Sequence, residues 1–247
     1  MKFWVLKRKT AIAAIGVVLM VLVAGVIFYT YALKDRSVAA GGPEPIFQGN
    51  TGSKMVAITV NVDWGEEFLP AMLTEFKKNN AQVTFFVTGR WAEKNADMLQ
   101  QMAQAGHSVQ NHGYRHVHFN ALGTEEIGSE IKKAEEIIFN ITGQKSSFFA
   151  SPYGEYNPRL VQAVNGIGYQ YIMWSVDTID WQKPAPETIV NRVMKKVHND
   201  AIILMHPTEP TVKALPTLLG QLQAQGYQMV SIDKITAGKS DGQNDAN

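Results

Sequence analysis

Between residues 55 and 232, short runs of β-branched and apolar residues alternate with longer segments of helical periodicity. Strands are predicted at residues 55–62, 82–87, 107–111, 147–149, 170–174, 201–205 and 228–232. Helices are predicted at residues 68–78, 92–104, 124–141, 158–165, 186–197 and 213–225. This alternation predicts an α/β fold with a mainly parallel sheet or barrel. In such folds the chemistry lies at the C-terminal ends of the strands.

The N-terminus predicts a membrane anchor. Residues 1–10 form a basic segment, and residues 11–33 contain no charged side chain. A helix needs about 20 apolar residues to cross the hydrocarbon core, and cations before such a segment favour a cytoplasmic N-terminus. We therefore expect a single-pass protein of the cell membrane, with its domain outside the cytoplasm. The alternative is a signal peptide cleaved after residues 38–40, Val-Ala-Ala.

The remaining chain divides into a linker, one domain and a tail. Residues 34–53 are rich in Gly, Ala and Pro and are predicted to be a linker, and the polar residues 237–247 a disordered tail. Residues 54–236 are enough for one globular domain with a sizeable core. The net charge of +1 does not indicate nucleic-acid binding. Because the chain has no cysteine, any metal must be held by His and carboxylate side chains.

Two histidines four positions apart, His112 and His116, follow the strand predicted at 107–111. Neutral imidazoles are good ligands for zinc and similar divalent ions. Asp63, after the first strand, supplies the carboxylate that a two-histidine site lacks. Three protein ligands with an open position are typical of catalytic zinc. The alternatives are hydrogen-bonded surface histidines and a carboxylate that caps a turn.

Other polar and aromatic residues also follow predicted strands, and we expect them to gather at the same edge of the sheet. They are Tyr153, Asp177, Asp180, Trp181 and His206. Trp181 lies beside two acidic residues, which suits a sugar-stacking surface better than an interior. The alternative for His206 is a core histidine at a strand end, and the aromatic residues are alternatively part of the core.

The chain over residues 55–232 resembles the polysaccharide deacetylases of the NodB-homology type, carbohydrate esterase family 4. The motifs that carry the resemblance, in order, are VNVDWGEE, GRWAEKN, NHGYRH, PYGEY, WSVDTIDW and LMHP. More narrowly, they resemble membrane-anchored, sporulation-associated deacetylase-like proteins of Bacillus-type bacteria. The resemblance implies a distorted parallel (β/α) barrel that removes acetyl groups from N-acetylglucosamine in peptidoglycan or chitin. It also implies a divalent metal, Zn²⁺ first, with Co²⁺ or Ni²⁺ also compatible.

The resemblance also implies roles for individual residues. The metal ligands are Asp63, His112 and His116. His206 is the general acid that protonates the leaving amine, and the backbone N–H of Tyr153 stabilises the oxyanion.

The substrate side of the site is implied in the same way. Trp181 and Leu204 resemble the walls of the acetyl pocket. Asp177 and Asp180 match the acidic fourth motif, with Asp180 assigned to the catalytic group and Asp177 to substrate binding.

Two positions depart from the family pattern. Asn61 occupies the place of the usual Asp base, and an amide cannot accept the proton of the attacking water. Ala150 replaces the Arg that orients that base by pairing with an acid of the fourth motif. Glu66 or Glu67 is the candidate for a substitute base.

Two interpretations therefore remain open. One is a metal-dependent N-deacetylase of cell-wall glycan that is slow or uses an unusual base. The other is a non-catalytic, metal-holding domain that binds envelope glycan. The retained His206 favours the first, and Asn61 and Ala150 favour the second.

Overall fold

The computed structural model describes residues 44–237. The predicted basic segment, the predicted membrane anchor at 11–33, residues 34–43 of the predicted linker and nearly all of the predicted tail lie outside these residues. Within residues 44–237, no helix is long and apolar enough to cross a membrane.

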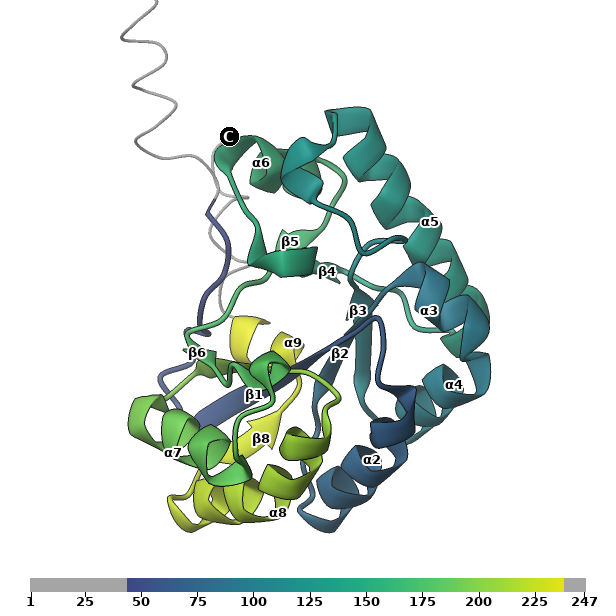
Figure 1. The fold of residues 1–247 in the computed structure, drawn as a ribbon. Helices are drawn as coiled ribbons and strands as arrows, with labels where there is room; N and C mark the ends of the chain where they lie inside the picture. The colour runs from purple at the N-terminus through teal and green to yellow at the C-terminus, as the bar shows by residue number, and fades with distance from the viewer. Residues whose placement is uncertain (1–43, 238–247) are drawn as a thin grey trace, which may run out of the picture. The chain divides into compact units, whose positions relative to one another are not determined.

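A curled sheet of eight strands forms the centre of the described domain (Figure 1). Along the sheet the strand order is β5-β4-β3-β2-β1-β7-β6, with β8 paired to β1, and the named strands pair in parallel. The strands are β1 (Met55–Val62), β2 (Thr84–Val87), β3 (Ser108–Asn111), β4 (Phe148–Phe149), β5 (Gln170–Tyr171), β6 (Val176–Asp177), β7 (Ala201–Met205) and β8 (Gln228–Val230). The predicted parallel α/β fold is confirmed.

The barrel is only half formed, which corrects the expectation of a barrel. The edge strands β5 and β6 do not pair with each other. Instead, the segment at residues 46–48 bridges the two sides, because Ile46 pairs with Ile172 and Gln48 pairs with Ala201. The sheet is therefore a curled half-barrel with this segment across its opening.

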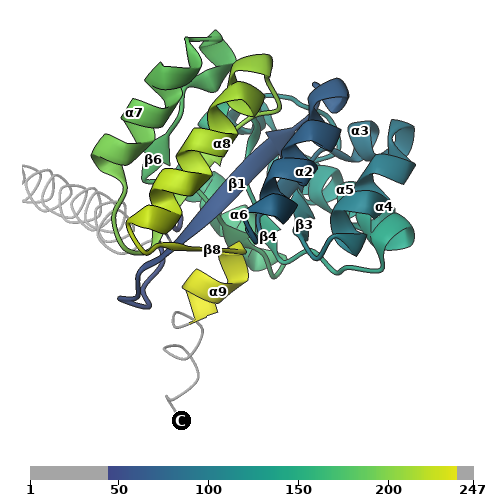
Figure 2. The same cartoon turned by 90° about the horizontal axis from the view of Figure 1, so that it is seen from below.

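Helices cover the outer surface of the sheet (Figures 1 and 2). They are α2 (Leu69–Lys78), α3 (Gly89–Lys94), α4 (Ala96–Gln104), α5 (Thr124–Thr142), α6 (Pro158–Gly166), α7 (Pro186–Lys196) and α8 (Glu209–Ala224). The short helix α9 (Ile232–Thr236) instead packs on the inner face, where its Ile232 and Ile235 cluster with Ala57, Phe86 and Ile202. Short 3-10 helices occupy the loops: η1 (Glu66–Phe68), η2 (Phe119–Ala121), η3 (Pro152–Gly154) and η4 (Asp180–Gln182). Figure 2 shows α8 between α7 and α2, and α8 packs against both.

Several predicted elements differ from the structure at their ends. The helix predicted at 92–104 is two helices, α3 and α4, because the backbone of Asn95 leaves the helical region at φ −125° and ψ 39°. The last predicted helix begins four residues early, at Glu209, because the Thr208 side chain accepts a hydrogen bond from the N–H of Thr211 and caps it. The strand predicted at 170–174 is shorter, and β6 and α9 were not predicted.

Strand β1 is the centre of the core and carries the candidate site at its end. One edge of β1 pairs with β7. Along the other edge, residues 55–57 pair with β8 and residues 59–62 pair with β2. Because β1 has neighbours on both edges and helices outside, all its residues after Met55 are buried. This run delivers Asn61 and then Asp63 to the C-terminal edge of the sheet.

A buried histidine outside the candidate site, His107, gives the core a dependence on pH. Its ring packs against Phe76 and Phe85, and its Nδ1 accepts a hydrogen bond from the N–H of Val83. The side chain is only 3% exposed, and this burial lowers the pKa of His107 from 6.5 to about 4. The fold therefore requires the neutral imidazole.

We expect the His107→Gln variant to lose less stability in acid than the wild type. The pKa of His107 is lower in the folded than in the unfolded chain. Neutral His107 therefore makes its full contribution to the free energy of unfolding above pH 6.5, and this contribution is lost as the pH falls toward 4. At 1.36 kcal/mol per pKa unit, the loss is roughly 3 kcal/mol. Urea unfolding at several pH values measures it. His198→Gln is the control, and equal acid losses in all three proteins would contradict the assignment.

Candidate active site

A cavity of about 440 Å³ lies at the C-terminal ends of the strands. Eight of the predicted site residues line it: Asn61, His112, His116, Tyr153, Asp177, Trp181, Leu204 and His206. Asp63 and Asp180 do not line this cavity: Asp180 contacts His206, which does, whereas Asp63 accepts a hydrogen bond from Thr88, which does not. The expected gathering of polar residues at one edge of the sheet is thus observed for most of the set.

His206 is held by a buried carboxylate. Its Nδ1 lies 2.8 Å from Oδ1 of Asp180, and its backbone N–H donates to Oδ2 of the same residue at 2.6 Å. Oδ2 also accepts a hydrogen bond from Oγ1 of Thr211 at 2.6 Å. The carboxylate of Asp180 is fully buried and accepts a hydrogen bond from Nδ1–H of His206. It therefore keeps a proton on Nδ1 and leaves Nε2 for proton exchange.

The histidine pair lies on the loop after β3. The ring centroids of His112 and His116 are 5.3 Å apart. Nδ1 of His112 lies 2.7 Å from the carbonyl oxygen of Ala150, which leaves Nε2 as the lone-pair nitrogen. Burial, and after it the neighbouring His116, lower the pKa of His112 to about 3. Burial also lowers the pKa of His116, although the charge of Asp63 opposes this change.

These donors have the chemistry that a divalent ion needs, namely neutral imidazoles and a carboxylate. The structure does not gather them into a finished site. Across residues 44–237, no group of three or more His, Asp or Glu side chains is placed so that it could hold a metal ion. Oδ1 of Asp63 instead accepts a hydrogen bond from Oγ1 of Thr88 at 2.6 Å. The triad of Asp63, His112 and His116 therefore stays a prediction.

The two positions that depart from the family pattern are both buried. Asn61 is 8% exposed and lines the cavity, and its Oδ1 has no hydrogen-bond partner among residues 44–237. A buried amide oxygen without a partner costs about 1–3 kcal/mol, so this atom invites a water or ligand group. Ala150 is 4% exposed, and its carbonyl orients His112. Glu66 and Glu67 are exposed in η1 and do not line the cavity.

Tyr153 has a strained backbone at the mouth of the cavity. Its φ of 61° is unusual for a residue with a side chain. Its ring stacks on His118, with centroids 4.1 Å apart and planes 14° apart, and meets His116 edge-on at 4.6 Å. The next residue, Gly154, leaves no room for a Cβ, because that atom would lie 2.5 Å from the ring of Trp174.

Some residues of the site were missed by the sequence analysis. Trp64 and Trp174 line the cavity, and the ring of Trp64 lies parallel to that of His206 with centroids 6.2 Å apart. Trp64 directly follows Asp63, so its place after a strand was the available signal. Thr88 donates a hydrogen bond to Asp63, and Thr211 donates one to Asp180. No local sequence pattern indicates either contact.

Comparison with known proteins identifies the fold and the family. Residues 48–172 match the family model for polysaccharide deacetylase. The uncharacterized protein YlxY of Bacillus subtilis is 39% identical over 193 residues, which cover 78% of this chain and 60% of that protein. A peptidoglycan-N-acetylglucosamine deacetylase of Bacillus cereus is 31% identical over 194 residues, covering 76% of this chain and 70% of that enzyme.

A solved relative is a pseudoenzyme. The crystal structure of a CE4 family pseudoenzyme from Bacillus anthracis matches with a TM-score of 0.76 and 38% identity, covering 80% of this chain and 70% of that chain. A mutant of that protein with restored enzymatic activity matches with the same TM-score at 37% identity, covering 80% of this chain and 73% of that one. This chain thus belongs to the polysaccharide deacetylase family, in which peptidoglycan deacetylases and a pseudoenzyme share its fold.

Proposed function

We propose that this chain is a metal-dependent N-deacetylase of cell-envelope glycan, acting on peptidoglycan or a related N-acetylglucosamine polymer. Its turnover is slow because Asn61 occupies the place of the base. The observation that carries this proposal is the His206–Asp180 pair beside an aromatic-lined cavity. A histidine whose Nδ1 is held by a buried carboxylate and whose ring lines a cavity is suited to proton transfer through Nε2.

Asp63, His112 and His116 are the residues that would hold the metal, Zn²⁺ first. When bound, such an ion polarises the acetamide carbonyl and acidifies water. The low pKa values of both histidines keep them neutral, as ligands must be. The carbonyl of Ala150 fixes the tautomer of His112. Histidines that bind metals commonly have such a hydrogen-bond acceptor on their other ring nitrogen.

The protein's own groups account for the rest of the reaction. The backbone N–H of Tyr153 donates to the oxygen of the acetamide as negative charge develops there. Trp181 and Leu204 contact the acetyl methyl group. Nε2 of His206 first takes a proton from the attacking water and then gives it to the departing amine, while Asp180, bonded to Nδ1–H, stabilises the orientation of the ring. Asn61 accepts a hydrogen bond from the attacking water through its free Oδ1 and orients it without removing a proton.

Acetate release from tetra-N-acetylchitotetraose and from purified peptidoglycan tests this function. With added Zn²⁺ or Co²⁺ we expect slow release above the rate without protein. His206→Ala is expected to lower that release by about 10²-fold, the smaller end of the effect of general acid catalysis. Release that is unchanged in His206→Ala would assign the activity to a contaminant or to another group.

A second function, glycan binding without hydrolysis, is favoured by different observations. The buried Oδ1 of Asn61 lacks a partner among the described residues, and no ready metal cluster exists within residues 44–237. A relative with 38% identity is a pseudoenzyme. In this case the glycan binds to the cavity, Trp181→Ala weakens binding, and no acetate is released by the wild type.

We also propose that residues 11–33 anchor the protein in the cell membrane with the domain outside, and that it acts in sporulation as the sequence resemblance implies. In a Bacillus-type host we expect the chain in the membrane fraction, with its domain accessible to protease in intact protoplasts. Deleting residues 11–33 should release it from that fraction. A mature chain that begins near Gly41 and accumulates in the medium would show cleavage instead.

A further inference from the structure

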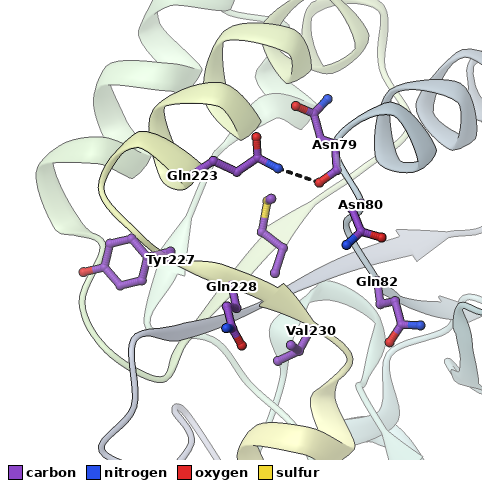
Figure 3. Close-up of a pocket in the computed structure, with 8 residues that line it drawn as sticks. Asn79, Asn80, Gln82, Gln223, Tyr227, Gln228 and Val230 are labelled. Carbon is purple, nitrogen blue, oxygen red and sulfur yellow. Dashed lines mark hydrogen bonds between the residues drawn. The ribbon is translucent and has the colours of Figure 1, made fainter.

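Figure 3 shows a second cavity, of about 510 Å³. It lies at the start of β1, whereas the cavity of His112 and His206 lies at the end of that strand. It opens where β8 pairs with the first residues of β1, between the C-terminal ends of α2 and α8. Met55 and Asn61 are six positions apart on β1, so at about 3.3 Å per residue the two cavities are separated by roughly 20 Å. We call it the amide pocket, after five of its residues: Asn79, Asn80, Gln82, Gln223 and Gln228.

The amide pocket is polar but uncharged. Its other lining residues are Tyr227, Met229 and Val230, so none of the eight carries a charge. Each carboxamide offers two N–H donors and one carbonyl acceptor. Figure 3 shows one of these groups already in use, because Nε2 of Gln223 donates to the backbone carbonyl of Asn79 at 2.6 Å.

Three of the carboxamides remain free for a ligand. The side chains of Asn80, Gln82 and Gln228 are exposed and make no hydrogen bond within residues 44–237. Their backbone is nevertheless fixed, since the N–H of Gln82 donates to Met229 and that of Gln228 to Lys54. Groups carried on a fixed backbone lose less entropy when they bind a ligand.

These features define the ligand. A charged ligand needs a partner of opposite charge, and no lining residue supplies one. Hydroxyl and acetamido groups donate and accept hydrogen bonds, as carboxamides do, and Met229 and Val230 offer apolar contact to the C–H face of a sugar ring. The volume lies within the 300–1,000 Å³ that is usual for ligand pockets. We propose that the amide pocket is a second binding site for an uncharged N-acetylated glycan, a choice of glycan that rests on the proposed function.

Titration of the ¹⁵N-labelled full-length chain with tetra-N-acetylchitotetraose tests the proposal. The side-chain NH₂ signals of Gln82 and Gln228 report on the amide pocket, and the indole N–H signal of Trp181 reports on the histidine cavity. We expect both sets of signals to shift with the sugar. Shifts of the NH₂ signals alone would support the amide pocket while contradicting the proposed function, and shifts of the indole signal alone would overturn the amide pocket.

Variants separate the amide pocket from unspecific effects. Replacing Gln82 and Gln228 together with Ala removes two sets of hydrogen bonds, so the Kd measured at the NH₂ signal of Asn80 should rise by about tenfold or more. The matched control is Gln101→Ala with Gln104→Ala, two exposed glutamines of α4, for which the Kd should not change. An equal Kd in both double variants would overturn the proposal. So would an NH₂ response to a sugar-free stem peptide as large as that to the sugar.

Discussion

Asn61→Asp combined with Ala150→Arg is expected to raise acetate release by about 10²- to 10⁴-fold over the wild type, the range that general base catalysis supplies. Asp at position 61 provides the carboxylate that accepts the proton of the attacking water. The side chain already faces the cavity with its Oδ1 free of partners among the described residues, so the new group needs no rearrangement of the backbone.

Neither change is expected to suffice alone. A carboxylate at position 61 without a cationic side chain beside it lacks the neighbour that would adjust its pKa to the task of a base. Arg at position 150 needs an acid, and both oxygens of Asp180 are already bonded to His206 and Thr211. Asp177 lines the same cavity and uses only Oδ1, which accepts the N–H of Ile179. We therefore expect Asp177 to be the partner of the new Arg.

The measurement is acetate release for the wild type, both single variants and the double variant, with metal content checked in each. The double variant should exceed the product of the two single effects, because acid, Arg and Asp177 act as a unit. Restoration is physically reasonable for this fold, since a mutant of the related pseudoenzyme has restored activity. A wild type that is already fast, and is slowed by Asn61→Asp, would indicate another base.

The fold was predictable where the pattern of side chains is dictated by burial alone. Strand β1 is apolar over nearly its whole length, and Ala201–Met205 is fully buried, so both were recognisable as central parallel strands. The strand β6 has only two residues, and it depends on pairing with β7 rather than on its own sequence. The bridge from Ile46 across the open side of the sheet likewise depends on contacts distant in the chain, so the incomplete barrel was not predictable.

The site was predictable to the extent that its residues follow strands. His206 and the histidine pair were recognised because each follows a strand in a parallel fold. The contact between Asp180 and His206 was not, because it joins residues 26 positions apart across two loops. Trp64 was missed for another reason: the sequence does not show whether a tryptophan is buried in the core or, like Trp64 at 41% exposed, lies at the surface.

His112→Ala is expected to abolish stoichiometric binding of Zn²⁺ to the chain. His112 is 1% exposed, its Nδ1 is fixed by the carbonyl of Ala150, and burial lowers its pKa to about 3, so it offers a neutral and oriented nitrogen. Its loss leaves one imidazole and Asp63, which make a poor site. Replacing a residue that only hydrogen-bonds to a metal ligand already lowers metal affinity by about 10- to 100-fold. Removing the ligand itself should therefore lower the affinity for Zn²⁺ by more than about 100-fold. Calorimetric titration of the metal-free chain with Zn²⁺ measures this.

The matched control is His118→Ala, which removes a neighbouring histidine from the same loop. His118 lies at the surface, and its Nδ1 contacts Glu155 rather than the histidine pair, so this variant should keep wild-type affinity. Circular dichroism of both variants separates loss of the ligand from unfolding, because only a folded variant tests the site. A wild type that binds no divalent ion, or a folded His112→Ala that binds Zn²⁺ as tightly as His118→Ala, would show that Asp63, His112 and His116 are not the metal ligands.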